Sequence, residues 1–102
     1  MELKIEETRL ENQLVLKVEG RLNAITTEEL QKMLMEKIEK ADNDIILDCE
    51  KLSFISSAGL RTLLIGQKAL QKKGYSLELL HVGKTMMRVL EMTGFDKMLK
   101  VS

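Results

Sequence analysis

The sequence predicts an α/β domain with a mixed β-sheet, in which an N-terminal hairpin precedes parallel strands and helices cover the sheet. Two observations indicate this class. Residues 3–19 alternate apolar and polar side chains on either side of a short polar turn, as the two strands of a hairpin do. After residue 26, segments with helical periodicity alternate with short apolar runs, which is the pattern of strands joined through helices.

The hairpin is expected from residues 3–10 and 14–19, with Gly20 ending its second strand and residues 21–25 forming a loop. A helix over residues 27–40 follows. Thr26 stands at its predicted N-cap, and Glu29 has the spacing of a capping box. Leu30, Leu34 and Ile38 recur on one face at helical spacing.

The apolar run at residues 45–49 predicts a strand covered on both faces, as in a parallel sheet. Residues 50–55 are expected to link it to a second helix over residues 57–73, which Gly74 ends. The inward face of this helix consists of leucines, and Gln67 is the one polar residue among them. The rest predicts a strand at residues 75–82, a helix at 84–92, and a final strand or docked tail at 95–101.

Length and composition limit the possible functions. A chain of 102 residues corresponds to one domain over residues 1–102, large enough to bury a core without disulfides. Sixteen basic residues balance sixteen acidic ones and aromatic residues make up only 3%, which argues against a nucleic-acid partner. No apolar stretch reaches the length of a membrane span and no signal peptide opens the chain, so we expect a cytoplasmic protein that does not contact membranes.

Catalytic signatures are missing from the sequence. It contains no Walker loop, no Gly-x-Gly-x-x-Gly, no Cys-x-x-Cys and no His-Glu-x-x-His motif. The lone Cys49 lies in an apolar run and is predicted to be a small buried hydrophobe. His81 is the only histidine, and a single histidine cannot build a metal site by itself. We therefore expect no catalytic residue, no cofactor and no metal, and a protein that is not an enzyme.

The most informative stretch is residues 54–61, where two hydroxyls, Ser56 and Ser57, stand between an apolar segment and the second helix. Serine is favoured at a helix N-cap, because its oxygen accepts a hydrogen bond from a free backbone amide. A helix N-terminus also attracts anions, so a phosphate on Ser57 could be held there. The two roles can coexist, with Ser56 as the cap and Ser57 as the reactive hydroxyl.

Three segments together resemble a STAS domain of the bacterial anti-sigma factor antagonists. The first is Gly20-Arg21-Leu22-Asn23-Ala24 ahead of the first helix, and the second is the strand, acidic turn and Ser-Ser-Ala-Gly-Leu-Arg run of residues 46–61. A weaker third segment joins residues 82–90 to Thr93-Gly94-Phe95. The resemblance covers nearly the whole chain in order. The chain departs from the best-known pattern at Asn23 and Ser56, since an Asp is common at each position.

This resemblance implies a phosphorylation switch. Ser57 would be phosphorylated by an anti-sigma factor that is also a serine kinase, with Ser56 as the alternative acceptor. The unphosphorylated protein would bind that partner and free the sigma factor, and a phosphatase would reset the phosphorylated form. The implied partner-binding residues are Gly20, Arg21, Leu22, Asn23, Ala24, Ser56, Ser57, Ala58, Gly59 and Arg61.

Two other functions remain open from the sequence. A STAS-type sensor could bind a small ligand or nucleotide through an anionic group at residues 57–59. A scaffold component of a stress-sensing assembly would need neither ligand nor phosphorylation.

Overall fold

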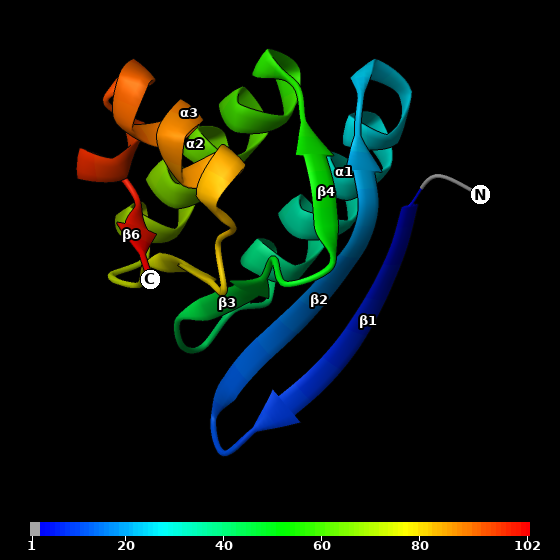
Figure 1. Cartoon of the computed structure of the whole chain (residues 1–102). Helices are drawn as coiled ribbons and strands as arrows, with labels where there is room; N and C mark the ends of the chain where they lie inside the picture. The colour runs from blue at the N-terminus through cyan, green and yellow to red at the C-terminus, as the bar shows by residue number, and fades with distance from the viewer. Residues whose placement is uncertain (1–2) are drawn as a thin grey trace.

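The computed structural model describes residues 3–102, which form one six-stranded sheet and three α-helices (Figure 1). The elements are, in chain order, β1 (Leu3–Leu10), β2 (Gln13–Leu22), α1 (Ala24–Glu39), β3 (Ile45–Asp48), β4 (Leu52–Ile55), α2 (Ser57–Lys72), β5 (Leu77–Leu80), α3 (Lys84–Thr93), the 3₁₀ turn η1 (Phe95–Lys97) and β6 (Lys100–Val101). The predicted α/β class with a mixed sheet is confirmed.

The N-terminal hairpin is present, but its second strand is longer than predicted. β1 and β2 pair antiparallel from Leu3 opposite Gly20 to Leu10 opposite Gln13. The prediction that Gly20 ends the strand was wrong, because β2 continues to Leu22. Gly20 has a φ of 118°, and the pairing of β2 with β4 shifts register between Gly20 and Arg21. Glycine adopts this backbone conformation at little cost, so the strand is interrupted there without ending.

The length of β2 allows it to pair with two strands along the same edge. Its first half pairs in parallel with β3, from Leu14 opposite Ile45 to Lys17 opposite Asp48. Its last residues pair in parallel with β4, which the sequence analysis treated as part of a linker. The sheet order is β1-β2-β3-β5-β6, and β4 joins β2 beyond the end of β3.

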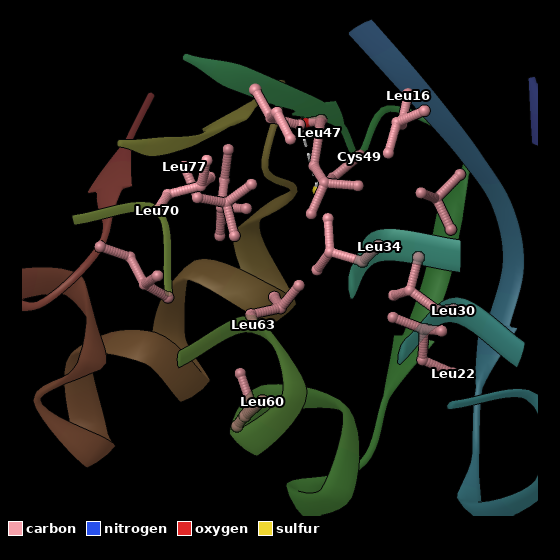
Figure 2. Close-up of a cluster of buried hydrophobic side chains, with 14 of the residues drawn as sticks. Leu16, Leu22, Leu30, Leu34, Leu47, Cys49, Leu60, Leu63, Leu70 and Leu77 are labelled. Atoms are coloured by element: carbon pink, nitrogen blue, oxygen red, sulfur yellow. Dashed lines mark hydrogen bonds between the residues drawn. The ribbon is translucent and has the colours of Figure 1, made fainter. Parts of the chain in front are cut away.

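The core lies between one face of the sheet and the helices. Alternate residues of the strands point into it together with the inward faces of all three helices, as Figure 2 shows for a cluster of these side chains. The largest fully buried side chains are Leu16, Leu22, Leu30, Leu34, Ile45, Leu47, Leu63, Leu70, Leu77, Leu79 and Leu90. At roughly 1.5 to 3 kcal/mol for each fully buried leucine or isoleucine, this layer dominates the stabilisation of the fold.

The other face of the sheet carries the alternate residues of the same strands. Lys17 and Glu19 of β2 are exposed there. Ile46 of β3 is buried on this face, with 8% of its surface exposed, although it lies outside the core cluster. The expectation that β3 is covered on both faces is therefore confirmed, since Ile46 is buried on this face and Ile45 and Leu47 are buried on the face that belongs to the core. Among residues 3–102, no helix has the length and apolar character needed to cross a membrane.

The C-terminal part combines the two predicted alternatives. α3 ends at Gly94, whose φ of 80° lies in the left-handed region that a helix C-cap commonly requires. The chain then forms η1 and the two-residue strand β6, which pairs in parallel with β5. The tail is thus docked through one turn and completed by a short strand.

Gln67, the polar residue on the inward face of α2, has a structural role. Its side chain is 6% exposed, and its Oε1 accepts a hydrogen bond of 2.6 Å from the backbone N–H of Leu77 at the start of β5. Its Nε2 donates a longer bond of 3.4 Å to the carbonyl oxygen of Met98. The amide therefore connects α2 to the sheet and to the C-terminal tail.

We expect Gln67→Leu to lower the free energy of unfolding by about 1 to 3 kcal/mol, because it leaves the buried N–H of Leu77 without a partner. Gln71→Leu is the matched control: it makes the same change one turn later on the exposed face of α2. Urea denaturation followed by circular dichroism measures both. Equal stability of the two variants would contradict the proposed role of the amide.

Candidate functional site

The candidate site lies where β2 and β4 end side by side. Leu22 and Ile55 are the last residues of these strands and pair with each other, and the N–H of Ser56 donates to the carbonyl oxygen of Leu22 at 2.8 Å. Because the two strands are parallel, the chain leaves both of them at the same edge of the sheet. The N-termini of α1 and α2 are therefore neighbours, although 33 residues separate them in the sequence.

Helix α1 begins earlier than predicted, and its cap is Asn23. The Oδ1 of Asn23 accepts hydrogen bonds of 2.9 Å from the N–H groups of Ile25 and Thr26. The Thr26 hydroxyl in turn accepts from the N–H of Asn23 at 2.9 Å, which completes a capping box. The prediction of Thr26 as N-cap with Glu29 as its partner was wrong, because Thr26 is the reciprocal partner of a cap three residues earlier.

Helix α2 begins at Ser57, as predicted, and Ser56 is its N-cap. The Ser56 Oγ accepts a hydrogen bond of 3.2 Å from the N–H of Gly59. Gly59 itself is held close to the strand ends: a Cβ at this position would lie 2.8 Å from Ile55 Cγ1 and 3.3 Å from Leu22 Cβ. Only a residue without a side chain lets the first turn of α2 pack this tightly against β2 and β4.

Ser57 is the first residue of α2, and its side chain is exposed. The first backbone N–H groups of a helix have no intrahelical partner, and the helix dipole favours negative charge at this end. An anionic group on the Ser57 oxygen would therefore be stabilised, whereas the same group at the other end of the helix would be repelled.

Within residues 3–102, the one histidine is not positioned to make Ser57 a nucleophilic catalyst. His81, the only histidine, is bonded to Asp48, which pairs with Lys17 of β2. Ser57 comes just after Ile55, which pairs with Leu22. Leu22 lies five residues beyond Lys17 along β2, and five residues span roughly 16 Å at the rise of a strand. The hydroxyl of Ser57 can accept a group from a partner, but His81 cannot activate it.

Two exposed apolar side chains flank the site, and the sequence analysis missed both. Ile25, in the first turn of α1, is 74% exposed, and Phe54 of β4 is 40% exposed. The guanidinium of Arg21 lies 4.5 Å from the centre of the Phe54 ring, which orients both side chains. Ile25 was assigned to a loop and Phe54 to a linker, and an apolar residue in such a segment gives no periodic signal.

A third segment of the chain reaches the same region. A groove of about 280 Å³ separates β4 from the start of α3, with Phe54 and Ile55 on one side and Gly83, Lys84 and Met86 on the other. The groove thus extends from the Phe54 side chain toward the N-terminus of α3.

The predicted partner-binding residues divide into two groups. Arg21, Ala24, Ser57 and Arg61 are exposed, and Gly20, Asn23, Ser56 and Ala58 are half-buried. Leu22 is only 1% exposed and Gly59 is also buried, so these two cannot contact a partner and instead support the surface from below. The exposed and half-buried members, together with Ile25 and Phe54, are called the strand-end surface from here on.

Three ionisable groups outside this surface have shifted pKa values. Burial raises the pKa of the Cys49 thiol to about 12, and the nearby Asp48 carboxylate adds to the rise, so the thiol stays protonated. Burial of Asp48 opposes its ionisation, but hydrogen bonds from His81 and from the N–H of Glu50 outweigh it, and the pKa of Asp48 is lowered. The same bond to Asp48 raises the pKa of His81. The prediction that Cys49 is a small buried hydrophobe is confirmed.

Comparison with known proteins identifies the family. The family model described as STAS domain matches residues 4–102. The anti-sigma-B factor antagonist of Staphylococcus aureus is 30% identical over 100% of this chain and 94% of its own length. The chain belongs to the STAS domain family.

Solved structures share the fold of this STAS domain. An anti-sigma factor antagonist from Mycobacterium paratuberculosis superimposes with a TM-score of 0.87 at 19% identity, covering 97% of this chain and 84% of that one. The Bacillus cell fate determinant SpoIIAA in its phosphorylated form superimposes with a TM-score of 0.74 at 22% identity, covering 98% and 90%. Both solved structures thus share the fold of this chain, and the Staphylococcus aureus relative is an anti-sigma-B factor antagonist.

The two serines are predicted to differ in their effect on stability. Ser56→Ala should lower the free energy of unfolding by about 1 kcal/mol, because it removes the N-cap bond to Gly59. Ser57→Ala should change it by less than about 0.5 kcal/mol, as is usual for an exposed position. Chemical denaturation of both variants against the parent protein measures the difference, and a larger loss for Ser57→Ala would contradict this assignment.

Proposed function

We propose that this STAS domain is an anti-sigma factor antagonist whose affinity for its partner is controlled by phosphorylation of Ser57. The unphosphorylated protein binds an anti-sigma factor through the strand-end surface. The anti-sigma factor, acting as a serine kinase, transfers the γ-phosphoryl group of ATP to the Ser57 oxygen and releases ADP. A phosphatase hydrolyses the phosphoserine and restores binding. Such a switch acts on transcription, so the proposal includes a cytoplasmic location.

The observation that carries the proposal is the position of the Ser57 hydroxyl. It is exposed at the first residue of α2, inside a surface that also presents Ile25 and Phe54. Exposed apolar side chains of this size beside a polar group are typical of interface anchors. The relatedness to an anti-sigma-B factor antagonist supports the same partner class, and the phosphorylated form of SpoIIAA supports a phosphoprotein of this fold.

The local chemistry supports a switch that needs no refolding. A phosphoserine carries about −1.5 to −2 charge at pH 7. At the N-terminus of α2 this charge is favourable for the isolated domain. In a closed interface the same charge must lose its water, and about 2.7 kcal/mol of penalty already lowers affinity a hundredfold. The domain therefore stays folded while the complex dissociates.

Ser56 is the weaker candidate for the acceptor. Its side chain is half-buried and its oxygen already accepts the N–H of Gly59. Phosphorylation of Ser56 would have to displace this cap, whereas phosphorylation of Ser57 leaves it intact. The geometry thus favours Ser57 as the acceptor.

Ser57→Asp should bind the anti-sigma factor at least tenfold more weakly than Ser57→Ala, because only the first substitution places a charge in the interface. The folded state should tolerate both, since an aspartate is favourable in the first turn of a helix. Isothermal titration calorimetry with the candidate anti-sigma kinase measures the affinities, and thermal unfolding measures the folded state.

The acceptor itself is tested by incubating the protein with ATP and the kinase and mapping the product by mass spectrometry. We expect phosphate on Ser57 in the parent protein and no phosphorylation of Ser57→Ala. Phosphate absent from both serines, or equal affinity of the two Ser57 variants, would refute the switch.

The apolar part of the surface gives an independent prediction. Ile25→Ala should weaken binding of the anti-sigma factor about tenfold or more, as truncation of an interface anchor does. Leu10→Ala is the matched control, because Leu10 is also an exposed aliphatic residue, at 59%, but lies at the hairpin turn, at the opposite end of β2. Surface plasmon resonance measures both, and equal losses would show that Ile25 is not part of the interface.

A further inference from the structure

Three side chains of types that can bind a metal ion meet where β3 and β5 end, outside the strand-end surface. They come from the end of β3, from the turn that follows it, and from the residue after β5: Asp48, Glu50 and His81. One ligand atom from each lies within 4.8 Å of the other two. The sequence analysis excluded a metal site because it considered the single histidine alone.

The parallel pairing of β3 with β5 brings these residues together. Asp48 pairs with Leu80, and the N–H of Cys49 donates to the carbonyl oxygen of Leu80 at 2.8 Å. The next residue, His81, therefore emerges directly beside Asp48. Its Nδ1 lies 2.9 Å from Asp48 Oδ1, which also accepts the N–H of Glu50 at 3.1 Å.

His81 has an unusual backbone conformation, and its ring is oriented by the hydrogen bond to Asp48. Its φ of 56° lies in the left-handed region, which is uncommon for residues other than glycine. The backbone thus turns sharply after β5 while the imidazole stays against Asp48. The ring and the carboxylate are oriented toward one another before any ligand arrives.

We propose that Asp48, Glu50 and His81 form a surface site for a divalent transition-metal ion of the Zn²⁺ type. One imidazole nitrogen and two carboxylate oxygens suit an ion of borderline softness, whereas Mg²⁺ and Ca²⁺ prefer oxygen ligands alone. The two carboxylates also balance the charge of the ion. This site is independent of the proposed phosphorylation switch.

The distances fit such an ion after a small adjustment. Ligand atoms bonded to Zn²⁺ at about 2.0 to 2.2 Å lie roughly 3.0 to 3.5 Å from one another. The present separations of up to 4.8 Å require mainly a rotation of the exposed Glu50 side chain. A hollow of about 140 Å³ lined by Asp48 and Glu50 adjoins the site and has room for the water ligands that complete the coordination.

The charged neighbours limit the affinity without blocking the site. Lys17 pairs with Asp48 across the sheet, and Lys51 follows Glu50 at the edge of the same hollow. Both lysines compete for the carboxylates but cannot replace the bond from an imidazole nitrogen to a metal. A bound ion would connect the β3–β4 turn to the end of β5, and that turn leads into β4, which ends directly before Ser56.

The sequence makes this proposal easy to test. His81 is the only histidine, and the one cysteine is buried with a thiol pKa of about 12, so neither an alternative imidazole nor the folded-state thiol competes for the ion. Isothermal titration calorimetry of the full chain with ZnCl₂ at pH 7, in a buffer that does not bind metals, should give one saturable site. Under the same conditions MgCl₂ should give none.

His81→Gln and Glu50→Gln should each weaken Zn²⁺ binding about tenfold or more, because each removes a ligand. Glu19→Gln is the matched control, since Glu19 lines the same hollow without belonging to the three-residue cluster. In NMR spectra, Zn²⁺ should shift the single imidazole resonance set of the parent protein. Far-UV circular dichroism establishes that the variants are folded.

Either of two results would overturn the proposal: no saturable Zn²⁺ binding by the parent protein, or the same affinity in folded His81→Gln as in the parent. Equal weakening by Glu19→Gln would also overturn it, because binding would then reflect the general negative charge of this face and not the three named ligands.

Discussion

The parallel pairing of β2 with β4 is the contact on which the functional surface depends. It places Leu22 beside Ile55, so that two chain segments leave the sheet at one edge and both enter helices there. Asn23 and Ser56 then satisfy the free amides of the two adjacent helix ends with side-chain oxygens. Without this pairing, residues 20–25 and 54–61 would be two unrelated turns, and Ser57 would be an isolated hydroxyl beside a helix.

The supporting residues explain why so small a module can present a stable surface. Leu22 and Gly59 are buried beneath it, and the short distance from Gly59 to Ile55 and Leu22 leaves no space for a side chain. Because the residues beneath the strand-end surface are tightly packed, the proposed phosphorylation of Ser57 would change the charge of the surface without moving the backbone.

The ends of β3 and β5 follow the same geometric rule with a different chemical result. There the pairing of β3 with β5 brings Asp48 and His81 into contact, and the hydrogen bond from His81 helps to lower the pKa of the half-buried Asp48 carboxyl. At the end of β2 and β4 the converging groups are hydroxyls, free amides and apolar side chains. At the end of β3 and β5 they are carboxylates and an imidazole. Each pair of strand ends therefore brings together side chains that are distant in the sequence, but the two sets of side chains differ in their chemistry.

Much of the fold was predictable because it is encoded locally. Alternation in residues 3–19 and helical spacing of apolar residues specified the hairpin and all three helices, and Gly74 and Gly94 marked helix ends correctly. The errors occurred where two local signals compete. Asn23 and Thr26 are both good caps, and only the reciprocal bonds in the folded chain show which one begins α1. β4 has four residues of intermediate or high exposure, so its periodicity is too weak to distinguish it from a linker.

The sequence by itself determined the class of the fold, the family through its ordered motifs, and the pair of serines at the start of α2. The tertiary structure confirmed Ser56 as the cap, and it alone decided that Ile25 and Phe54 belong to the same surface and that His81 has two carboxylates beside it. The physical reason is that strand pairing joins residues more than 30 positions apart in register, and a register is set by the whole buried face of a strand. Local patterns predict which elements form, whereas only their packing shows which side chains meet.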